Sequence, residues 1–300
     1  MPSDRKKACS AFTLVELLCV LLLDSVIAGS AIAVLVGSIK AYEQILALTE
    51  ARRRGQMALQ ILRLPVENAG LGIPANAEDF RAAIQVGQAK VTDLSLWNGP
   101  VSTDGNEIRL VYAVPTSTVN SSPATETMPS DDRSVRLSNP PQSGQVQSWS
   151  GLGPAKTRSW VVFPPSPCPF LVTNLANQTL SVRSSSRSWI PHNSRIHYLR
   201  AIRALVVRLP EQDPAFCTED ISTGSGLQER VVGVPAFRPV YDPRTRTLCL
   251  TILSRGGERR SRMISPAFLP GWPDRIDDED RHYVLAVTRW ACRIRNGGYP

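Results

Sequence analysis

Residues 12–39, FTLVELLCVLLLDSVIAGSAIAVLVGSI, are apolar enough to cross a membrane, yet they contain two carboxylates, Glu16 and Asp24. As a helix this segment would be about 42 Å long, more than the ~30 Å that the hydrocarbon core of a bilayer requires. A carboxylate at the bilayer centre costs about 2.5 to 3.5 kcal/mol, so acidic residues in such a segment indicate a function. We therefore expect a membrane-spanning helix whose two carboxylates contact partners.

Three basic residues, Arg5, Lys6 and Lys7, come just before the apolar segment. Positive residues beside a membrane helix usually stay in the cytoplasm, so this arrangement places the bulk of the chain outside the cytoplasm. The alternative is a cleavable secretory signal, with SAIA ending at Ala33 as its cleavage site. The length of the apolar run and its acidic residues argue against a secretory signal.

The stretch KKACSA followed by FTLVELL resembles the prepilin signal of type IV pilins and pseudopilins. In that family a membrane peptidase cuts before the Phe and methylates the new amine, and a Glu four residues later takes part in assembly. The resemblance implies cleavage between Ala11 and Phe12, N-methylation of Phe12, and docking of Glu16 with the N-terminal amine of a neighbouring subunit. It departs from the family at Ala11, where Gly is usual.

Asp24 is not explained by this resemblance. It lies eight residues after Glu16 and therefore about 80° further round a helix, facing a different neighbour. We expect the Asp24 carboxylate to contact a basic or polar group on the membrane helix of a partner.

Apolar residues at helical spacing continue beyond the membrane segment, and Pro65 predicts the end of the helix. We thus expect a leader at 1–11, a membrane and assembly helix at 12–39, an amphipathic continuation at 40–64 and a globular body at 65–300. Residues 57–74, MALQILRLPVENAGLGIP, resemble the segment after the helix in PilW-like minor pilins and the related minor pseudopilin J.

The body reads as β-rich, because short β-branched and aromatic runs are separated by Pro, Gly, Asn and Ser. Residues 115–157, rich in Ser, Thr, Pro and Gly, predict a flexible insertion. We therefore expect an α+β, pilin-like fold with an antiparallel β domain after the long helix. The predicted strands are 107–114, 159–163, 169–174, 195–209, 230–241, 246–253 and 283–295. In the last of them Trp290, Cys292 and Ile294 alternate with Arg289, Arg293 and Arg295, which predicts a half-buried antiparallel strand.

The body cysteines have no C-x-x-C spacing, which makes a zinc site improbable. In an exported body four cysteines suggest up to two disulfides, and the sequence does not choose among the three pairings. Four reduced thiols are the alternative. The residues concerned are Cys168, Cys217, Cys249 and Cys292.

The sequence contains no motif that indicates catalysis. The three histidines lie outside any metal-spaced cluster, and no G-x-S-x-G, phosphate-loop or dinucleotide motif occurs. The acidic run at 277–280 lacks the ligand spacing of a calcium site and is expected to be solvated. We predict that the chain is not an enzyme and binds no cofactor or metal.

These patterns favour an interaction protein: a PilW-type minor pilin that acts with other minor pilins in a tip or priming complex. Its expected partners are the prepilin peptidase, other minor pilins, the major pilin and the assembly platform of the inner membrane. Its body is expected in the periplasm, reaching the cell surface after assembly. The alternatives are a J-like pseudopilin of type II secretion and an adhesive or DNA-binding tip subunit, the last because the net charge is +8.

Overall fold

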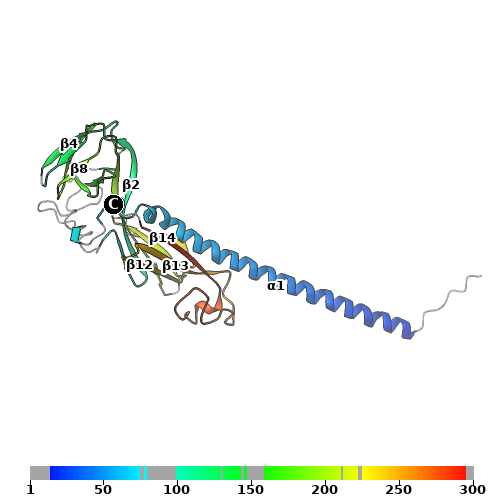
Figure 1. Cartoon of the computed structure of the whole chain (residues 1–300). Helices are drawn as coiled ribbons and strands as arrows, with labels where there is room; N and C mark the ends of the chain where they lie inside the picture. Colours follow the sequence, from blue (N-terminus) through cyan, green and yellow to red (C-terminus); the bar gives the residue numbers. More distant parts are fainter. Residues whose placement is uncertain are drawn as a thin grey trace, which may run out of the picture.

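The computed structural model describes residues 14–74, 78–79, 99–129, 131–142, 145–146, 159–210, 212–221 and 225–294. These residues form a long helix, α1 (Leu14–Glu67), followed by an antiparallel β-rich body that packs on its C-terminal part (Figure 1). The expected α+β class and the long apolar N-terminal helix are confirmed. The predicted leader at 1–11, the cleavage site at Ala11 and the methylation site at Phe12 lie outside the described residues.

Helix α1 contains 54 residues and is therefore about 81 Å long. The predicted end at residue 64 is too early, because the helix continues through Pro65 to Glu67. Pro65 and Val66 are buried against the body. That packing stabilises the last turn and offsets the hydrogen bond that the proline cannot donate.

The larger sheet has β9 (Arg195–Val207) at its centre. One edge of β9 pairs with β2 (Glu107–Val119), and its other edge is shared by β5 (Trp160–Val162) and β10 (Ala215–Asp220). The order along the sheet is β1-β2-β9-β5-β6-β7-β4, with β11 added beside β10. The other strands are β1 (Val101–Asp104), β4 (Asp132–Arg136), β6 (Phe170–Ala176), β7 (Thr179–Arg183) and β11 (Leu227–Val232).

A second sheet of three strands carries the helix. It consists of β12 (Ala236–Asp242), β13 (Thr247–Gly256) and β14 (Val284–Arg293), in that order. The loop between β13 and β14 ends in a short 3₁₀ turn, η2 (Asp280–His282). The predicted alternation in the last strand is confirmed, since Trp290, Cys292 and Ile294 are more buried than Arg289 and Arg293.

Two expectations for the body need correction. The run 230–241 is not one strand: it is split between β11 and β12, which belong to different sheets. Gly233, at a φ of 79°, turns the chain between them, and the N–H groups of Gly233 and Val234 both donate to the carbonyl of Pro214.

The second correction concerns 115–157, which we expected to be a flexible insertion. The described part of this range contains the end of β2, all of β4, and β3 (Thr125–Thr127), which pairs with β8 (Ser188–Ile190). Some of its polar side chains form hydrogen bonds within the body: the Thr116 hydroxyl, for example, donates to the Ile196 carbonyl at 2.8 Å. Residues 147–158 lie outside the described residues.

The main core joins the helix to both sheets. Leu62 and Val66 of α1 are fully buried against Phe216, Phe237 and Leu250. The rings of Phe216 and Phe237 meet edge to face at a centroid distance of 5.4 Å. A separate core, containing Phe163 and Phe170, lies between the strands farthest from α1. The helix is therefore a structural part of the body from Ala47 onward, and the apolar segment before it is not.

Candidate functional site

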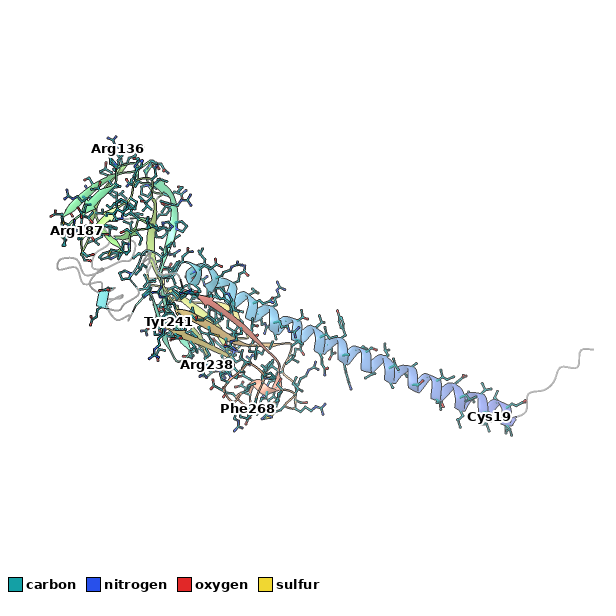
Figure 2. All side chains as sticks on the ribbon, viewed as in Figure 1. Cys19, Arg136, Arg187, Arg238, Tyr241 and Phe268 are labelled. Carbon is teal, nitrogen blue, oxygen red and sulfur yellow. The ribbon has the colours of Figure 1, made fainter. Side chains whose placement is uncertain are left out.

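The N-terminal half of α1 is an apolar surface without a cover. Every residue from 14 to 46 is exposed, and Leu14, Val34 and Ile45 expose 63 to 75% of their surface. Figure 2 shows this segment extending away from the body, with Cys19 near its far end. The helix is long and apolar enough to cross a membrane. A surface of this kind needs an apolar environment, which a bilayer or the helices of other subunits supply.

The two predicted carboxylates both lie on this exposed segment. Glu16 lies in the first turn of α1, where the positive end of the helix dipole favours a negative charge. Asp24 lies two turns further on, and within the described residues no hydrogen bond or ion pair reaches its carboxylate. Its neighbour Ser25, in contrast, donates to the carbonyl of Leu22 at 2.7 Å. Asp24 therefore presents an unsatisfied anion in an apolar surface.

A stripe of small residues seats the C-terminal half of α1 on the body. Ala47, Ala51, Gly55 and Ala58 recur at helical spacing and are all buried. The Ser254 hydroxyl of β13 donates to the Ala51 carbonyl at 2.7 Å. The helix backbone thus lies directly on β13, which larger side chains would prevent.

Of the three arginines at 52–54, one contacts the body at this junction and two face solvent. Arg54 donates to the carbonyl of Arg255 at 2.9 Å and pairs with Glu50, whose carboxylate also accepts from the N–H of Gly257 at 2.9 Å. Arg52 and Arg53 are exposed. Side-chain bonds therefore tie the helix to the end of β13 and to the start of the loop that follows it.

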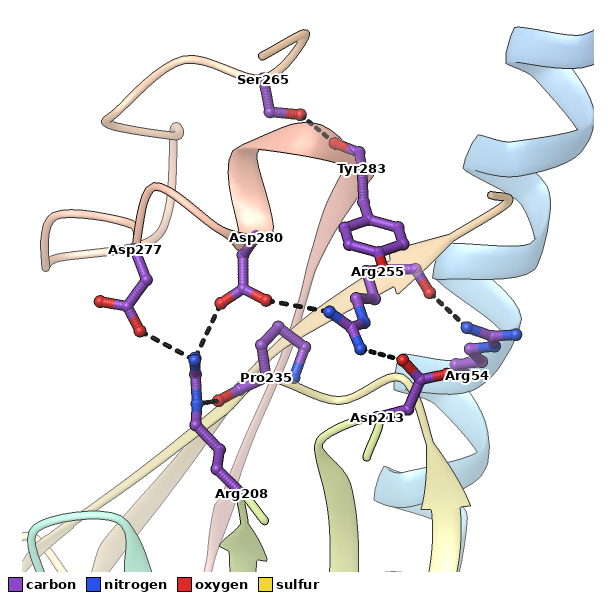
Figure 3. Close-up of polar contacts among 9 residues, drawn as sticks. All are labelled: Arg54, Arg208, Asp213, Pro235, Arg255, Ser265, Asp277, Asp280 and Tyr283. Carbon is purple, nitrogen blue, oxygen red and sulfur yellow. Dashed lines mark hydrogen bonds and ion pairs between the residues drawn. The ribbon is translucent and has the colours of Figure 1, made fainter. Parts of the chain in front are cut away.

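A buried ion cluster holds that loop against the body (Figure 3). Arg255 and Asp280 are almost wholly buried and pair at 3.4 Å, and Arg208 pairs with the other oxygen of Asp280 at 2.8 Å. The Arg255 guanidinium also pairs with Asp213 and lies 4.2 Å from the ring centroid of Tyr283. Burial raises the pKa of Asp280, and the two arginines offset only part of that rise.

The expectation that the acidic run at 277–280 is simply solvated therefore needs correction, because three of its four carboxylates form ion pairs. Asp277 pairs with Arg208 at 2.9 Å, and Asp278 pairs with Arg281 at 3.0 Å. In the part of the chain that the structure describes, no group of three His, Cys, Asp or Glu side chains is arranged to hold a metal ion. Asp277, Asp278 and Asp280 therefore serve as partners for arginines, whereas Glu279 is exposed.

All four body cysteines are free thiols in the structure, so the expected disulfides are not formed in it. Cys249 and Cys292 lie on neighbouring strands, but Cys249 is opposite Ala291 and Cys292 is opposite Leu248. Successive residues of a strand point to opposite faces, so these two thiols face apart. Cys168 lies beside the hydroxyl of Ser186, and Cys217 is buried on β10.

Comparison with family models, with curated proteins and with solved structures finds no match to this chain. Its own residues are therefore the basis for a functional interpretation. The structure adds one feature that the sequence analysis missed, the Arg255–Asp280 pair. The acidic run was visible in the sequence, but its arginine partners come from separate strands.

Proposed function

We propose that the chain is a minor pilin: an anchored subunit that is cut and methylated at Phe12 and then joins other minor pilins through its exposed helix. The single observation that carries this proposal is that the sequence FTLVE, residues 12–16, runs into an apolar helix that the structure describes from Leu14 and whose residues 14–46 are all exposed. A pilin needs such a surface twice, first for storage in the bilayer and then for packing against other subunits.

Glu16 has a physical role in this proposal. After cleavage, the new amine at Phe12 is a cation that must enter an apolar fibre core. A carboxylate of a neighbouring subunit neutralises it, and in a medium of low dielectric constant such a pair acts strongly on the register of the helices. Asp24, lying about 12 Å further along the helix, sets a second polar contact with a different neighbour.

The first test is the chemical state of the mature N-terminus. The full chain is produced together with a prepilin peptidase, extracted from the membrane and analysed by mass spectrometry. We expect a chain that begins with N-methylated Phe12. A chain that begins at Val34, after a secretory cleavage, or one that keeps residues 1–11 in the presence of active peptidase contradicts the proposal.

The second test separates assembly from processing. Glu16→Gln keeps the size and hydrogen-bonding capacity of the side chain but removes its charge. We expect this variant to be cleaved and methylated normally yet to co-purify poorly with its partner subunits. Asp24→Asn is the matched variant on the same exposed surface, and we expect it to lose only one of the partners.

The set of partners retained by the unaltered chain decides the system. Co-purification with pilus subunits favours a minor pilin, whereas co-purification with the pseudopilins of a type II secretion system favours the J-like alternative. Normal recruitment of every partner by Glu16→Gln would contradict the role that we assign to this carboxylate.

A further inference from the structure

The loop between β13 and β14, residues 257–283, carries exposed basic and apolar side chains close together. Phe268 exposes 66% of its surface, and Met263 and Ile264 expose 44% and 41%. Arg259 and Arg262 are exposed in the same stretch. Figure 2 shows Phe268 at the end of the body nearer to the N-terminal half of α1. The loop thus lies where the helix leaves the body.

A groove between the loop and α1 fixes the level of the loop along the helix. Val36, Ile39 and Lys40 line the groove from the helix, and Arg262, Ile264 and Leu269 line it from the loop. At the end of the groove nearer to the seated half of the helix, Arg260 of the loop pairs with Glu43 of α1 at 3.2 Å. The loop therefore runs beside residues 36–43 of the helix.

This level coincides with the end of the apolar segment. From Leu14 to Ile39 the helix has no basic residue, and Lys40 is the first. That length is about 39 Å, against ~30 Å for the hydrocarbon core, so a membrane spanned by α1 has its headgroups near Lys40. Whatever lies beside residues 36–43 then lies among those headgroups.

Some charged side chains of the loop and of the adjacent helix form ion pairs, and others are left unpaired. Four of the loop's six acidic residues pair with arginines: Asp274 with Arg238, Asp277 with Arg208, Asp278 with Arg281, and Asp280 with two arginines. Within the described residues Glu258 and Glu279 are exposed and form no ion pair. Likewise, among the described residues Lys40, Arg259 and Arg262 form no ion pair. The unpaired charges of this part of the helix and the loop are thus three cations against two anions, a net positive charge.

The loop is also held in one conformation by its own hydrogen bonds. The Ser265 hydroxyl donates to the Tyr283 carbonyl at 2.6 Å, and the N–H of Ile276 donates to the Ala267 carbonyl at 2.9 Å. The N–H groups of Ile264 and Ser265 both donate to the Arg281 carbonyl. Little ordering entropy is therefore lost when the loop contacts a surface.

We propose that loop 257–283 docks the body onto the membrane that α1 spans. Lys40, Arg259 and Arg262 bind the phosphate groups of anionic phospholipids, and Met263, Ile264 and Phe268 enter the interfacial region. The contact sets the height and tilt of the body above the bilayer. This inference requires only that α1 spans a membrane, and it does not depend on the proposed function as a pilin.

Hydrogen exchange on the full chain tests this contact. The protein is placed, one copy per particle, in nanodiscs of phosphatidylcholine alone or of equal parts phosphatidylcholine and phosphatidylglycerol. Each basic residue near an anionic surface contributes about fivefold to binding, so the two arginines together are worth up to about 25-fold. We expect amide exchange across 257–270 to slow by up to that factor in the anionic discs, and the slowing to disappear at about 1 M salt, where the Debye length is about 3 Å.

A matched pair of variants separates this contact from general attraction to the bilayer. Arg259→Ala/Arg262→Ala should abolish the slowing. Arg52→Ala/Arg53→Ala removes the same charge from two exposed arginines that lie about 18 Å further from Lys40 along the helix, and it should leave the slowing unchanged. All four side chains are exposed, so neither variant is expected to unfold.

Two results would overturn the inference. One is equal exchange across 257–270 in neutral and anionic discs. The other is protection that follows the number of protein copies per disc rather than the lipid charge, which would assign the surface to a neighbouring subunit.

Discussion

Replacement of Gly256 by alanine tests whether the helix is seated directly on β13. A Cβ atom at this position would lie 2.0 Å from the carbonyl oxygen of Ala47 and 2.6 Å from the backbone nitrogen of Ala51. Both atoms belong to the helix backbone, so no side-chain rotation can relieve the contact. Real Cβ atoms essentially never come within 3.0 Å of a heavy atom to which they are not linked through the local chain, and the helix and strand must therefore separate by about 1 Å.

The cost of this separation follows from the contacts across the junction. Overpacking a well-filled site costs about 1 to 3 kcal/mol. A displacement of 1 Å also stretches the 2.7 Å bond from Ser254 to Ala51 and the 2.9 Å bond from Arg54 to Arg255 beyond hydrogen-bonding range, at about 1 kcal/mol each. We expect Gly256→Ala to lower the free energy of unfolding by about 3 to 5 kcal/mol.

Urea unfolding of the full chain in detergent, followed by tryptophan fluorescence, measures this difference. With an m-value of about 2 kcal/mol per M, the midpoint should fall by about 1.5 to 2.5 M at unchanged m. Gly37→Ala is the matched control, because a Cβ at that helical glycine meets no heavy atom within 4 Å. Midpoints for the two variants within about 0.5 M of each other would refute close seating of the helix.

Three further predictions concern the body. Leu62→Ala should cost about 2 to 5 kcal/mol in the same unfolding assay because Leu62 is fully buried, whereas Leu64→Ala, at a site 53% exposed, should cost under about 1 kcal/mol; equal costs would contradict the assigned helix face. Burial alone would raise the pKa of Glu107, but hydrogen bonds from two arginines outweigh burial, and the pKa lies below its ordinary value of 4.5. Glu107 therefore stabilises the fold above pH 4.5, and this stability is lost as the pH falls through the lowered pKa. Glu107→Gln should therefore weaken the loss of stability below that pH, and an unchanged acid dependence of the urea midpoint would oppose this role. Burial raises the pKa of Cys292 to about 11. Maleimide labelling followed by mass spectrometry should therefore show a labelling rate at neutral pH about a hundredfold below that of an ordinary thiol, and the rate should still rise above about pH 9. A labelling rate that reaches a plateau below about pH 9 would be inconsistent with burial.

The sequence predicted the elements whose patterns are local. The apolar run predicted the N-terminal helix, and the alternation around Trp290 predicted β14 and its buried face. Both signals come from side-chain periodicity, which depends only on near neighbours in the chain. The same reasoning failed at Pro65, because tertiary packing of the last turn of the helix offset a local signal for its end.

The features that the sequence did not predict depend on contacts between distant segments. The split of 230–241 depends on which sheet each half joins, and in the sequence Gly233 and Pro235 mark the break between the halves. Similarly, the polar run after Val114 was expected to be a flexible loop, yet Thr116 finds a carbonyl 80 residues further along the chain. Composition reports what a segment can bury by itself, and it does not report the partners that the fold brings to it.

The division of α1 into two halves decides which substitutions report on assembly. Residues 14–46 are all exposed, and the ion pair of Glu43 with Arg260 of the body lies 19 residues beyond Asp24, whereas Leu62 and Val66 lie fully buried in the main core. A charge-removing change at Glu16 or Asp24 therefore has no route to the stability of the body, and a lost interaction in such a variant is a property of the exposed helix. A change at the small-residue stripe acts on both folding and assembly, because it alters the fold of the body and also the angle at which the helix leaves the body. The two carboxylates are thus the positions where assembly can be tested separately from folding.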